Sequence, residues 1–315
     1  MKVLVNDHIA EEAVDKLRTK YEVTAKFHDK DQLLDVISDF DALIVRSKTK
    51  VTKEVIEKGE NLKVIGRAGI GVDNIDMECA TERRIPVVNA PRSSTISVAE
   101  LTIGHMISLA RHLPFADKSM KAGLWEKKKL MGTELHGKTL GLVGCGRIGA
   151  EVASRAVAFG MNVLAFDPHV PKDVQDRIPC TFTELDDLLK NSDFISIHSL
   201  LSDETRGMIG KEQFEMMKDS ARVINCAREP IIDEAALVDA LEKGKIGGAA
   251  LDVFDKEPPE ESLILIAPNV VFTPHLDAST REAQIKAGTT TAEQVDQVLS
   301  GERPDFIVNR QIYDS

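Results

Sequence analysis

Residues 138–167 read KTLGLVGCGRIGAEVASRAVAFGMNVLAFD. Apolar runs at 140–143 and 163–166 predict two buried strands. Between them the motif GCGRIG, at 144–149, opens a segment whose apolar residues recur at helical spacing. The order strand, glycine turn, helix, strand is typical of a dinucleotide-binding unit in a parallel sheet.

Each glycine of the motif has a physical role in such a unit. Gly144 permits the tight turn, Gly146 lets the backbone approach a pyrophosphate, and Gly149 lets the helix pack close to the strand. The N-terminus of the helix presents backbone N–H groups and a positive dipole to the phosphates. A lone glycine motif is weak evidence, and a purely structural turn is the alternative interpretation. Here the spacing and both flanking elements agree with nucleotide binding.

Asp167 ends the second strand, where its carboxylate can accept hydrogen bonds from the adenosine ribose hydroxyls. The next residues are Pro168, His169 and Val170, so no arginine or lysine directly follows to bind a ribose phosphate. The carboxylate would also repel that phosphate. The sequence therefore predicts NAD rather than NADP as the cofactor.

The composition is that of a soluble globular protein long enough for two domains, with 315 residues, 43% hydrophobic and 29% charged. The net charge of −11 argues against a general nucleic-acid or anionic-membrane surface, so an anionic substrate requires a locally positive pocket. The four cysteines form no CxxC pair, which favours reduced structural thiols and no metal site. Neither a signal peptide nor a membrane-spanning run is present, so we expect a cytoplasmic protein.

Short apolar strands alternate with amphipathic helices over residues 1–90, which predicts a parallel sheet with helices on its faces. Ligands of open α/β sheets bind beyond the carboxyl ends of the strands. Arg46 and Arg67 follow two of the predicted strands and are therefore candidate anion clamps. Either arginine taken alone is more often a surface or ion-pair residue. From Ala278 the chain reads as one long helix with a short tail, which most simply packs back on the first domain.

Polar residues also follow three predicted strands of the second domain. Arg228 follows the strand at 222–226, Glu257 lies in the acidic segment after the strand at 248–253, and His275 follows the strand at 270–273. In a parallel sheet these strand ends share the edge that carries the glycine turn, so the side chains converge where a nicotinamide would lie.

Such a set suits the oxidation of a secondary alcohol beside a carboxylate. His275 can take the hydroxyl proton because imidazole titrates near neutral pH. Glu257 can orient the ring and stabilise its protonated form. Arg228 offers a planar fork for the carboxylate. Singly, each would be read as an ordinary loop or surface residue, and their convergence beside a nucleotide site favours catalysis.

Motifs along nearly the whole chain resemble those of the D-isomer-specific 2-hydroxyacid dehydrogenases. They include VRS at 45–47, GRAGIGVDN at 66–74, SVAELT at 97–102, GCGRIG at 144–149, NCAR at 225–228, LDVFDKEPP at 251–259 and PHLDAST at 274–280. The resemblance implies an α/β fold with two Rossmann-like domains of parallel sheet. The NAD-binding domain, 93–279, would be inserted into a discontinuous, flavodoxin-like substrate domain formed by 1–92 and 280–315.

The resemblance also assigns site residues. It implies the catalytic set that the strand ends suggest, Arg228, Glu257 and His275. It implies cofactor contacts at Gly144, Gly146, Arg147, Ile148, Gly149, Asp167, Ser199, Cys226, Ala227, Arg228, Asp252, His275 and Ala278. The residues that we expect to contact the substrate are Arg46, Ser47, Arg67, Gly69, Arg228 and His275.

The implied reaction is the NAD-dependent oxidation of D-3-phosphoglycerate to 3-phosphohydroxypyruvate, with hydroxypyruvate, glyoxylate or another small 2-hydroxy acid as alternative substrates. A second alternative is a non-catalytic NAD-sensing binding protein, because corepressors that resemble this family keep its fold. We also expect a homodimer built largely from 93–133. The chain ends at Ser315 without the regulatory domain of longer members, so feedback by serine through such a domain is not expected.

Several positions depart from the family pattern. Arg228 is followed by Glu229 and Pro230 where two glycines are common, which brings a negative charge near the proposed anion site. Asp277 replaces a glycine, Ser93 and Ser94 replace a frequent Gly-Asn pair, and Ile70 replaces a hydroxyl residue. None removes a catalytic group, so the departures concern the choice of substrate more than the reaction.

Overall fold

Parallel strands form two separate sheets in the computed structural model of this chain, which describes residues 1–313. The chain divides into two units. Unit 1 comprises residues 1–94 and the chain from 278 onward, and unit 2 comprises residues 95–277. The chain passes from one unit to the other at 94/95 and 277/278, close to the expected domain boundaries at 92/93 and 279/280.

Unit 1 contains a five-stranded sheet in the order β2-β1-β3-β4-β5, in which every strand pair is parallel. This is the flavodoxin-like order. Its strands are β1 (Lys2–Val5), β2 (Glu22–Ala25), β3 (Ala42–Val45), β4 (Val64–Arg67) and β5 (Val87–Asn89). Its helices are α1 (Glu11–Arg18), α2 (Lys30–Val36), α3 (Lys53–Lys58), α4 (Met77–Glu82) and α12 (Arg281–Leu299).

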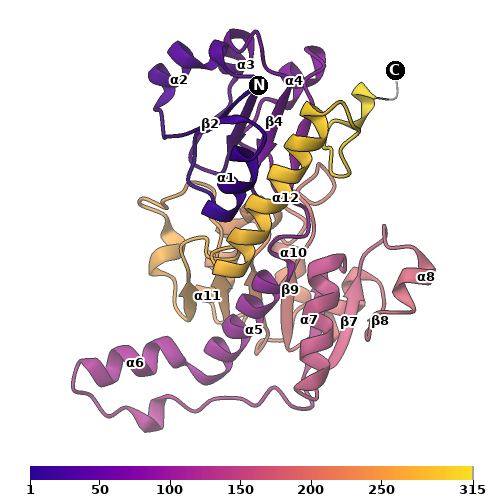
Figure 1. The fold of residues 1–315 in the computed structure, drawn as a ribbon. Coiled ribbons are helices and arrows are strands. Elements are labelled where there is room, and N and C mark those ends of the chain that lie inside the picture. Colours follow the sequence, from indigo (N-terminus) through magenta and orange to yellow (C-terminus); the bar gives the residue numbers. More distant parts are fainter. Residues whose placement is uncertain (314–315) are drawn as a thin grey trace. The chain divides into compact units, whose positions relative to one another are not determined.

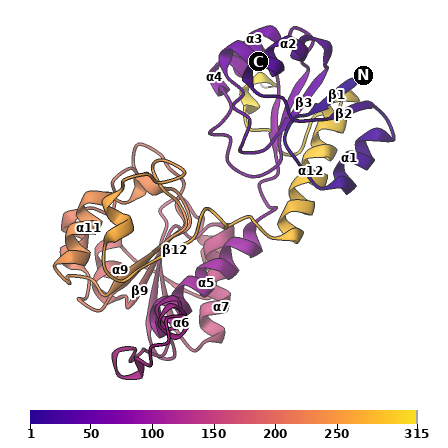
Figure 2. The same ribbon diagram turned by 90° about the vertical axis from the view of Figure 1, so that its left-hand side faces the viewer.

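Alternation along the strands divides the core of unit 1 into two layers. Leu4, Leu43 and Ile65 face α2, α3 and α4, whereas Val3 and Ile44 face α1 and α12. Figures 1 and 2 show α1 beside the yellow α12 on one face of the sheet. The long C-terminal helix therefore supplies part of the core of the first unit.

The tail after α12 is fixed to β5 by a buried side chain. Asn309 is 2% exposed, accepts the Val87 N–H at 2.9 Å and donates to the Ile85 carbonyl at 2.9 Å. Ile307 forms an antiparallel bridge with Val88 beside it. The tail thus satisfies backbone groups at the open edge of the sheet.

Unit 2 contains a seven-stranded, fully parallel sheet in the order β12-β11-β10-β9-β6-β7-β8. Its strands are β6 (Thr139–Val143), β7 (Asn162–Phe166), β8 (Thr181–Phe182), β9 (Phe194–Ile197), β10 (Arg222–Asn225), β11 (Gly248–Leu251) and β12 (Val270–Phe272). Its helices are α5 (Thr95–Arg111), α6 (Leu113–Lys121), α7 (Arg147–Ala158), α8 (Lys172–Gln175), α9 (Leu185–Asn191), α10 (Lys211–Met216) and α11 (Glu234–Glu242).

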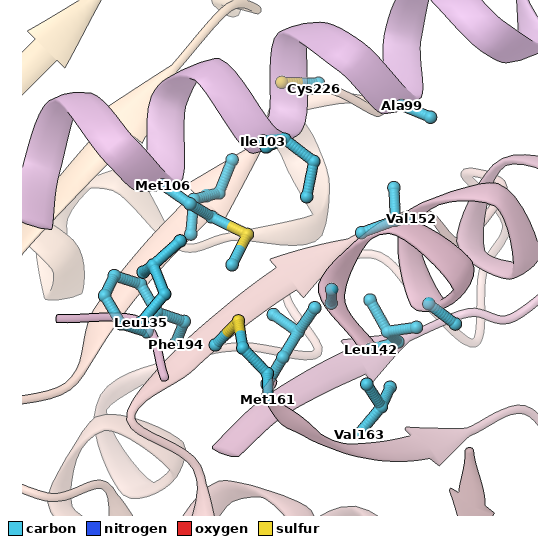
Figure 3. Packing of buried hydrophobic residues seen from close by; sticks show 14 of the residues in the cluster. Ala99, Ile103, Met106, Leu135, Leu142, Val152, Met161, Val163, Phe194 and Cys226 are labelled. Carbon is cyan, nitrogen blue, oxygen red and sulfur yellow. The ribbon is translucent and has the colours of Figure 1, made fainter. Parts of the chain in front are cut away.

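The two faces of this sheet are covered by different helices. On one face α5 and α7 pack against each other and against the central strands, where Ile103, Met106 and Val152 contact a layer that includes Leu142 and Phe194 (Figure 3). On the other face the core includes residues of α9, α10 and α11. Within residues 1–313, none of the helices combines the length and apolar character needed to cross a bilayer.

Some short elements have no clear pattern in the sequence. They include β2 and α2, within residues 21–41, and β8, which follows the dinucleotide unit. All four residues of β2 are half-buried or exposed, and α2 buries only Leu33, so neither carries a clear periodic signal. β8 has two residues, fewer than periodicity can detect.

We expect Asn309→Ala to destabilise unit 1 by about 1–3 kcal/mol, because it leaves the Val87 N–H and the Ile85 carbonyl buried without a partner. Urea unfolding followed by circular dichroism measures this loss. The exposed Gln311, changed to Ala, is the matched control and should stay within about 0.5 kcal/mol of wild type. Equal stability of the two variants would show that the tail does not anchor the sheet.

Candidate functional site

The glycine turn lies at the carboxyl end of β6, where the order of the sheet reverses between β7 and β9. Gly144 has φ +90°, and a Cβ there would lie 2.6 Å from the backbone nitrogen of Ser199. A Cβ at Gly149 would lie 2.6 Å from the Gly144 carbonyl oxygen, whereas one at Gly146 would meet nothing within 4 Å. Two glycines therefore let chain segments pack closely, and the third leaves open space above the turn.

That open space lies at the N-terminus of α7. Gly146 is the N-cap residue and no side chain caps the helix, so α7 begins at Arg147 with its positive dipole end beside the open space. The Ser199 hydroxyl donates to the Val143 carbonyl at 3.1 Å and holds the neighbouring loop against the turn. The geometry fits the pyrophosphate of a dinucleotide.

Asp167 directly follows β7 and fastens the turn from the side. Its carboxylate accepts the Cys145 N–H at 2.8 Å and the His169 N–H at 3.0 Å. Each carboxylate oxygen has a second lone pair, so Asp167 can also accept the hydroxyl groups of a ribose.

Arg228 follows β10 in a loop that Asn225 shapes. The Asn225 side chain accepts the Ala227 N–H at 3.0 Å and donates to the Arg228 carbonyl at 3.0 Å. The Arg228 guanidinium donates to the Ala227 carbonyl at 2.8 Å. Cys226 lies in the same loop, and burial raises the pKa of its thiol, which keeps it neutral.

His275 and Glu257 form a directly bonded pair. The His275 Nδ1 atom lies 2.9 and 2.8 Å from the two Glu257 carboxylate oxygens. An ionised carboxylate can only accept, so Nδ1 carries the proton and Nε2 is left to exchange a proton with a substrate. Asp277 lies on that side, with Oδ1 at 3.7 Å from Nε2. Both members of the pair are about two-fifths exposed, with side-chain values of 41% and 40%.

Asp252, at the end of β11, is fully buried and holds the loop that contains His275. Its carboxylate accepts the Leu276 N–H at 2.7 Å, the Asp277 N–H at 2.9 Å and the hydroxyl of Thr273. The sequence assigned Asp252 to cofactor contact only. The structure adds this second task and a partner, Thr273, that the sequence reasoning missed.

In unit 1, Arg46 follows β3 and its loop is held by Asp7 and Asn74. The Asp7 carboxylate accepts the Arg46 N–H at 2.6 Å, and the Asn74 side chain donates to the Arg46 carbonyl at 2.7 Å. Ser47 is part of the same loop. Sequence reasoning missed Asp7, although it comes soon after β1 at the same edge of the sheet.

The Arg46 guanidinium is half-buried, and burial lowers its pKa. It forms no ion pair with any residue in 1–313, and it lines a cavity of ≈ 540 Å³ together with His8, Glu12 and Arg281. An unpaired, partly desolvated guanidinium that lines a cavity is suited to bind an anion.

Arg67 ends β4, and its neighbour in the sheet register is Val45, directly before Arg46. A Cβ at Gly69 would lie 1.4 Å from the Arg67 guanidinium, so a side chain there would displace Arg67, and the φ of +154° at Gly69 itself favours glycine. The two expected clamps therefore lie at neighbouring strand ends within unit 1.

The expected site residues thus form two groups, one in each unit. Those of unit 2 gather at the carboxyl edge of its sheet, while Arg46, Ser47, Arg67, Gly69 and Ala278 belong to unit 1. Over the part of the chain that the structure describes, His, Cys, Asp and Glu side chains form no cluster of three that could hold a metal ion.

Residues 103–276 match the profile described as "D-isomer specific 2-hydroxyacid dehydrogenase, NAD binding domain". The chain is 52% identical over 311 residues to D-3-phosphoglycerate dehydrogenase of Methanocaldococcus jannaschii, covering 98% of this chain and 59% of that protein. It is 48% identical over 299 residues to hydroxypyruvate reductase of Thermotoga maritima, covering 93% of this chain and 97% of that protein.

Among solved structures, the TT0316 protein from Thermus thermophilus is similar with a TM-score of 0.89 and 36% identity, covering 98% of this chain and 100% of that chain. The chain spans only 59%, 58% and 54% of the length of three phosphoglycerate dehydrogenases that it matches. The profile spans more than half of the chain, and it agrees with the glycine turn in specifying NAD as the cofactor. The chain therefore belongs to the D-isomer specific 2-hydroxyacid dehydrogenase family.

Proposed function

We propose that this protein oxidises D-3-phosphoglycerate to 3-phosphohydroxypyruvate with NAD, which is the first step of serine synthesis. The observation that carries the reaction type is the His275–Glu257 pair, which leaves Nε2 available at the edge of a sheet that bears a dinucleotide turn. The choice of substrate rests on identities of 52%, 50% and 48% to proteins named D-3-phosphoglycerate dehydrogenase.

Each catalytic residue then has one task. His275 takes the proton of the substrate hydroxyl at Nε2, and Glu257 keeps the ring oriented through Nδ1–H and stabilises the imidazolium that forms. Arg228 binds the substrate carboxylate with its planar fork. Bound NAD supplies the hydride acceptor.

Cofactor binding is assigned to the residues around the glycine turn and the strand ends of unit 2. Gly144, Gly146 and Gly149, with the N-terminus of α7, hold the pyrophosphate, and Asp167 accepts the ribose hydroxyls. Ser199, Cys226, Ala227 and Asp252 line the nicotinamide side of the same edge. We also assign Ala278 to cofactor binding.

In unit 1, Arg46 and Arg67 are the proposed anion-binding residues, with Ser47 and Gly69 beside them. A net charge of −11 makes local positive charge necessary for a phosphorylated acid. The unpaired Arg46 beside its cavity supports this assignment.

A second candidate is reduction of hydroxypyruvate, an unphosphorylated 2-keto acid. It is favoured by one observation, because the hydroxypyruvate reductase of Thermotoga maritima matches over 97% of its own length. The two functions share the catalytic residues and differ in the need for a phosphate site. We also propose a cytoplasmic location, which the four free cysteines support.

Glu229 bears on the substrate because it directly follows Arg228. Burial, followed by the negative charges of Asp255 and Glu234, raises the pKa of Glu229 to about 7. Near neutral pH a large fraction of Glu229 therefore carries no charge, which reduces its repulsion of an anionic substrate.

The segment 113–131 supports a homodimer. It exposes a series of large apolar side chains, Leu113, Phe115, Met120, Leu124, Trp125 and Met131. In Figure 1, α6 and the chain that follows it stand away from the sheet of unit 2. An apolar stretch of this size on the surface is typical of a protein interface, and we propose that two copies of the chain associate through it.

The first test compares NADH oxidation with 3-phosphohydroxypyruvate, hydroxypyruvate, glyoxylate and pyruvate. Wild type should have its highest kcat/KM with the phosphorylated acid. Arg228→Ala should lower kcat/KM for every acid by about a hundredfold or more, since it removes the carboxylate fork. Arg46→Ala should strongly lower kcat/KM only for the phosphorylated acid.

If wild type has its highest kcat/KM with hydroxypyruvate, and Arg46→Ala does not change that value, the second candidate function replaces the first. NADH binding without turnover of any acid would reject both in favour of a sensor.

The raised pKa of Glu229 makes stability depend on pH. The unfolded chain ionises Glu229 from its ordinary pKa of 4.5 upward, whereas the folded chain keeps the proton until about 7. Wild type therefore loses stability as pH rises through this window, and Glu229→Gln does not. Urea unfolding at pH 5 and pH 8 should show that the free energy of unfolding of the variant increases relative to that of wild type at pH 8. The same change at the exposed Glu242 should give no such pH difference.

Light scattering after size exclusion tests the dimer. Wild type should have twice the chain mass of 34.6 kDa, and the double variant Trp125→Glu, Met131→Glu should have that of one chain, because charges enter the apolar contact. Ile266→Glu changes a residue 80% exposed outside the segment and should leave the dimer intact. A monomeric wild type would contradict the proposal.

A further inference from the structure

His105 is a buried polar residue in the middle of an apolar helix. It lies in α5 and is only 3% exposed, while its neighbours Ile103 and Met106 belong to the apolar layer between α5, α7 and the sheet (Figure 3). Its Nε2 atom lies 3.1 Å from the hydroxyl oxygen of Thr273. A buried imidazole is costly unless it is hydrogen-bonded, so the contact with Thr273 matters for His105.

The direction of the hydrogen bonds follows from the number of protons. Both oxygens of Asp252 accept hydrogen bonds, and one of them accepts the proton of the Thr273 hydroxyl. A hydroxyl has only one proton to donate, so His105 must donate its Nε2–H to Thr273. The chain of donors runs from His105 through Thr273 to Asp252.

This series of hydrogen bonds ends at the backbone of the loop that carries His275. Asp252 binds the N–H groups of Leu276 and Asp277, and the Thr273 carbonyl accepts the His275 N–H at 3.0 Å. His275 itself has φ +51°, a left-handed backbone conformation that is unfavourable for residues other than glycine. The surrounding hydrogen bonds must therefore hold it in place.

We propose that His105 is a positioning residue for His275 and acts through Thr273 and Asp252. The inference rests on the proposed function, in which His275 exchanges the substrate proton. By donating to Thr273, His105 polarises the hydroxyl and strengthens its hydrogen bond to Asp252. Asp252 in turn fixes the loop 275–277, on which the direction of the imidazole depends.

The environment of His105 suits this role. Burial lowers its pKa, opposed by the negative charge of Asp252, so the ring is neutral near neutral pH. A neutral Nε2–H donor supplies one hydrogen bond without placing a positive charge beside Asp252. A packing residue of similar size, such as leucine, would fill the space but supply no donor.

The test compares two replacements of His105 with a packing control. His105→Leu removes the donor, and His105→Gln keeps an N–H donor. Met106→Leu changes packing on the same helix but leaves the hydrogen bonds among His105, Thr273 and Asp252 unchanged. We expect kcat with 3-phosphohydroxypyruvate to fall on the order of tenfold in His105→Leu, below the ~100-fold cost of a 1 Å misplacement, with KM for NADH within about twofold. His105→Gln should recover most of the lost kcat, and Met106→Leu should keep the wild-type kcat.

A second readout does not need turnover. The imidazole resonances of His275 should shift in His105→Leu and return in His105→Gln, and ¹⁵N spectra should show the Nε2–H form of His105. If His105→Leu does not fold, Thr273→Val interrupts the same chain one step later and should give the same shift and the same loss of kcat.

Equal loss in both His105 variants, or unchanged His275 resonances, would overturn the inference. So would an Nδ1–H form of His105. A wild type that turns over none of the acids would instead reject the proposed function, and the His275 resonances would still decide the role of His105.

Discussion

The parallel direction of every strand in unit 2 is the constraint on which its site depends. Because β6, β9, β10, β11 and β12 all point the same way, the residues that directly follow them share one edge. That edge receives the glycine turn, the Arg228 loop, Asp252 and His275. Reversing a single strand would send its terminal residue to the opposite edge, some four residues or about 13 Å away.

Buried polar side chains fix the loops at these strand ends. Asp7 binds the loop of Arg46, Asn225 shapes the loop of Arg228, and Asp252 holds the loop of His275. Each lies at or shortly after the end of a strand and bonds backbone groups that have lost the partners of a continued sheet. At each loop the buried neighbour thereby takes up the structural task.

The sequence predicted the parts of this arrangement that have a period or a spacing. The GCGRIG motif and its flanking runs predicted the dinucleotide turn, and the ends of the predicted strands indicated that Arg228, Glu257 and His275 lie at one edge of the sheet. Short elements with little burial, such as β2 and α2, were missed because so few residues contact the core. The partnership of His105 with Thr273 was not visible either. It joins residues far apart in the chain, and a single histidine in an apolar helix has no spacing to reveal its partner.

The discontinuity of unit 1 has a consequence for the order in which the chain folds during synthesis. One face of its sheet, which includes Val3 and Ile44, is covered by Ala292, Val295 and Leu299 of α12. These residues leave the ribosome only after all of unit 2, so that apolar face lacks part of its cover while unit 2 is made. Unit 2 is continuous and has all of its own core by residue 277. The cofactor-binding unit can thus mature first, and the emergence of α12 then becomes the event that completes the unit begun at the N-terminus.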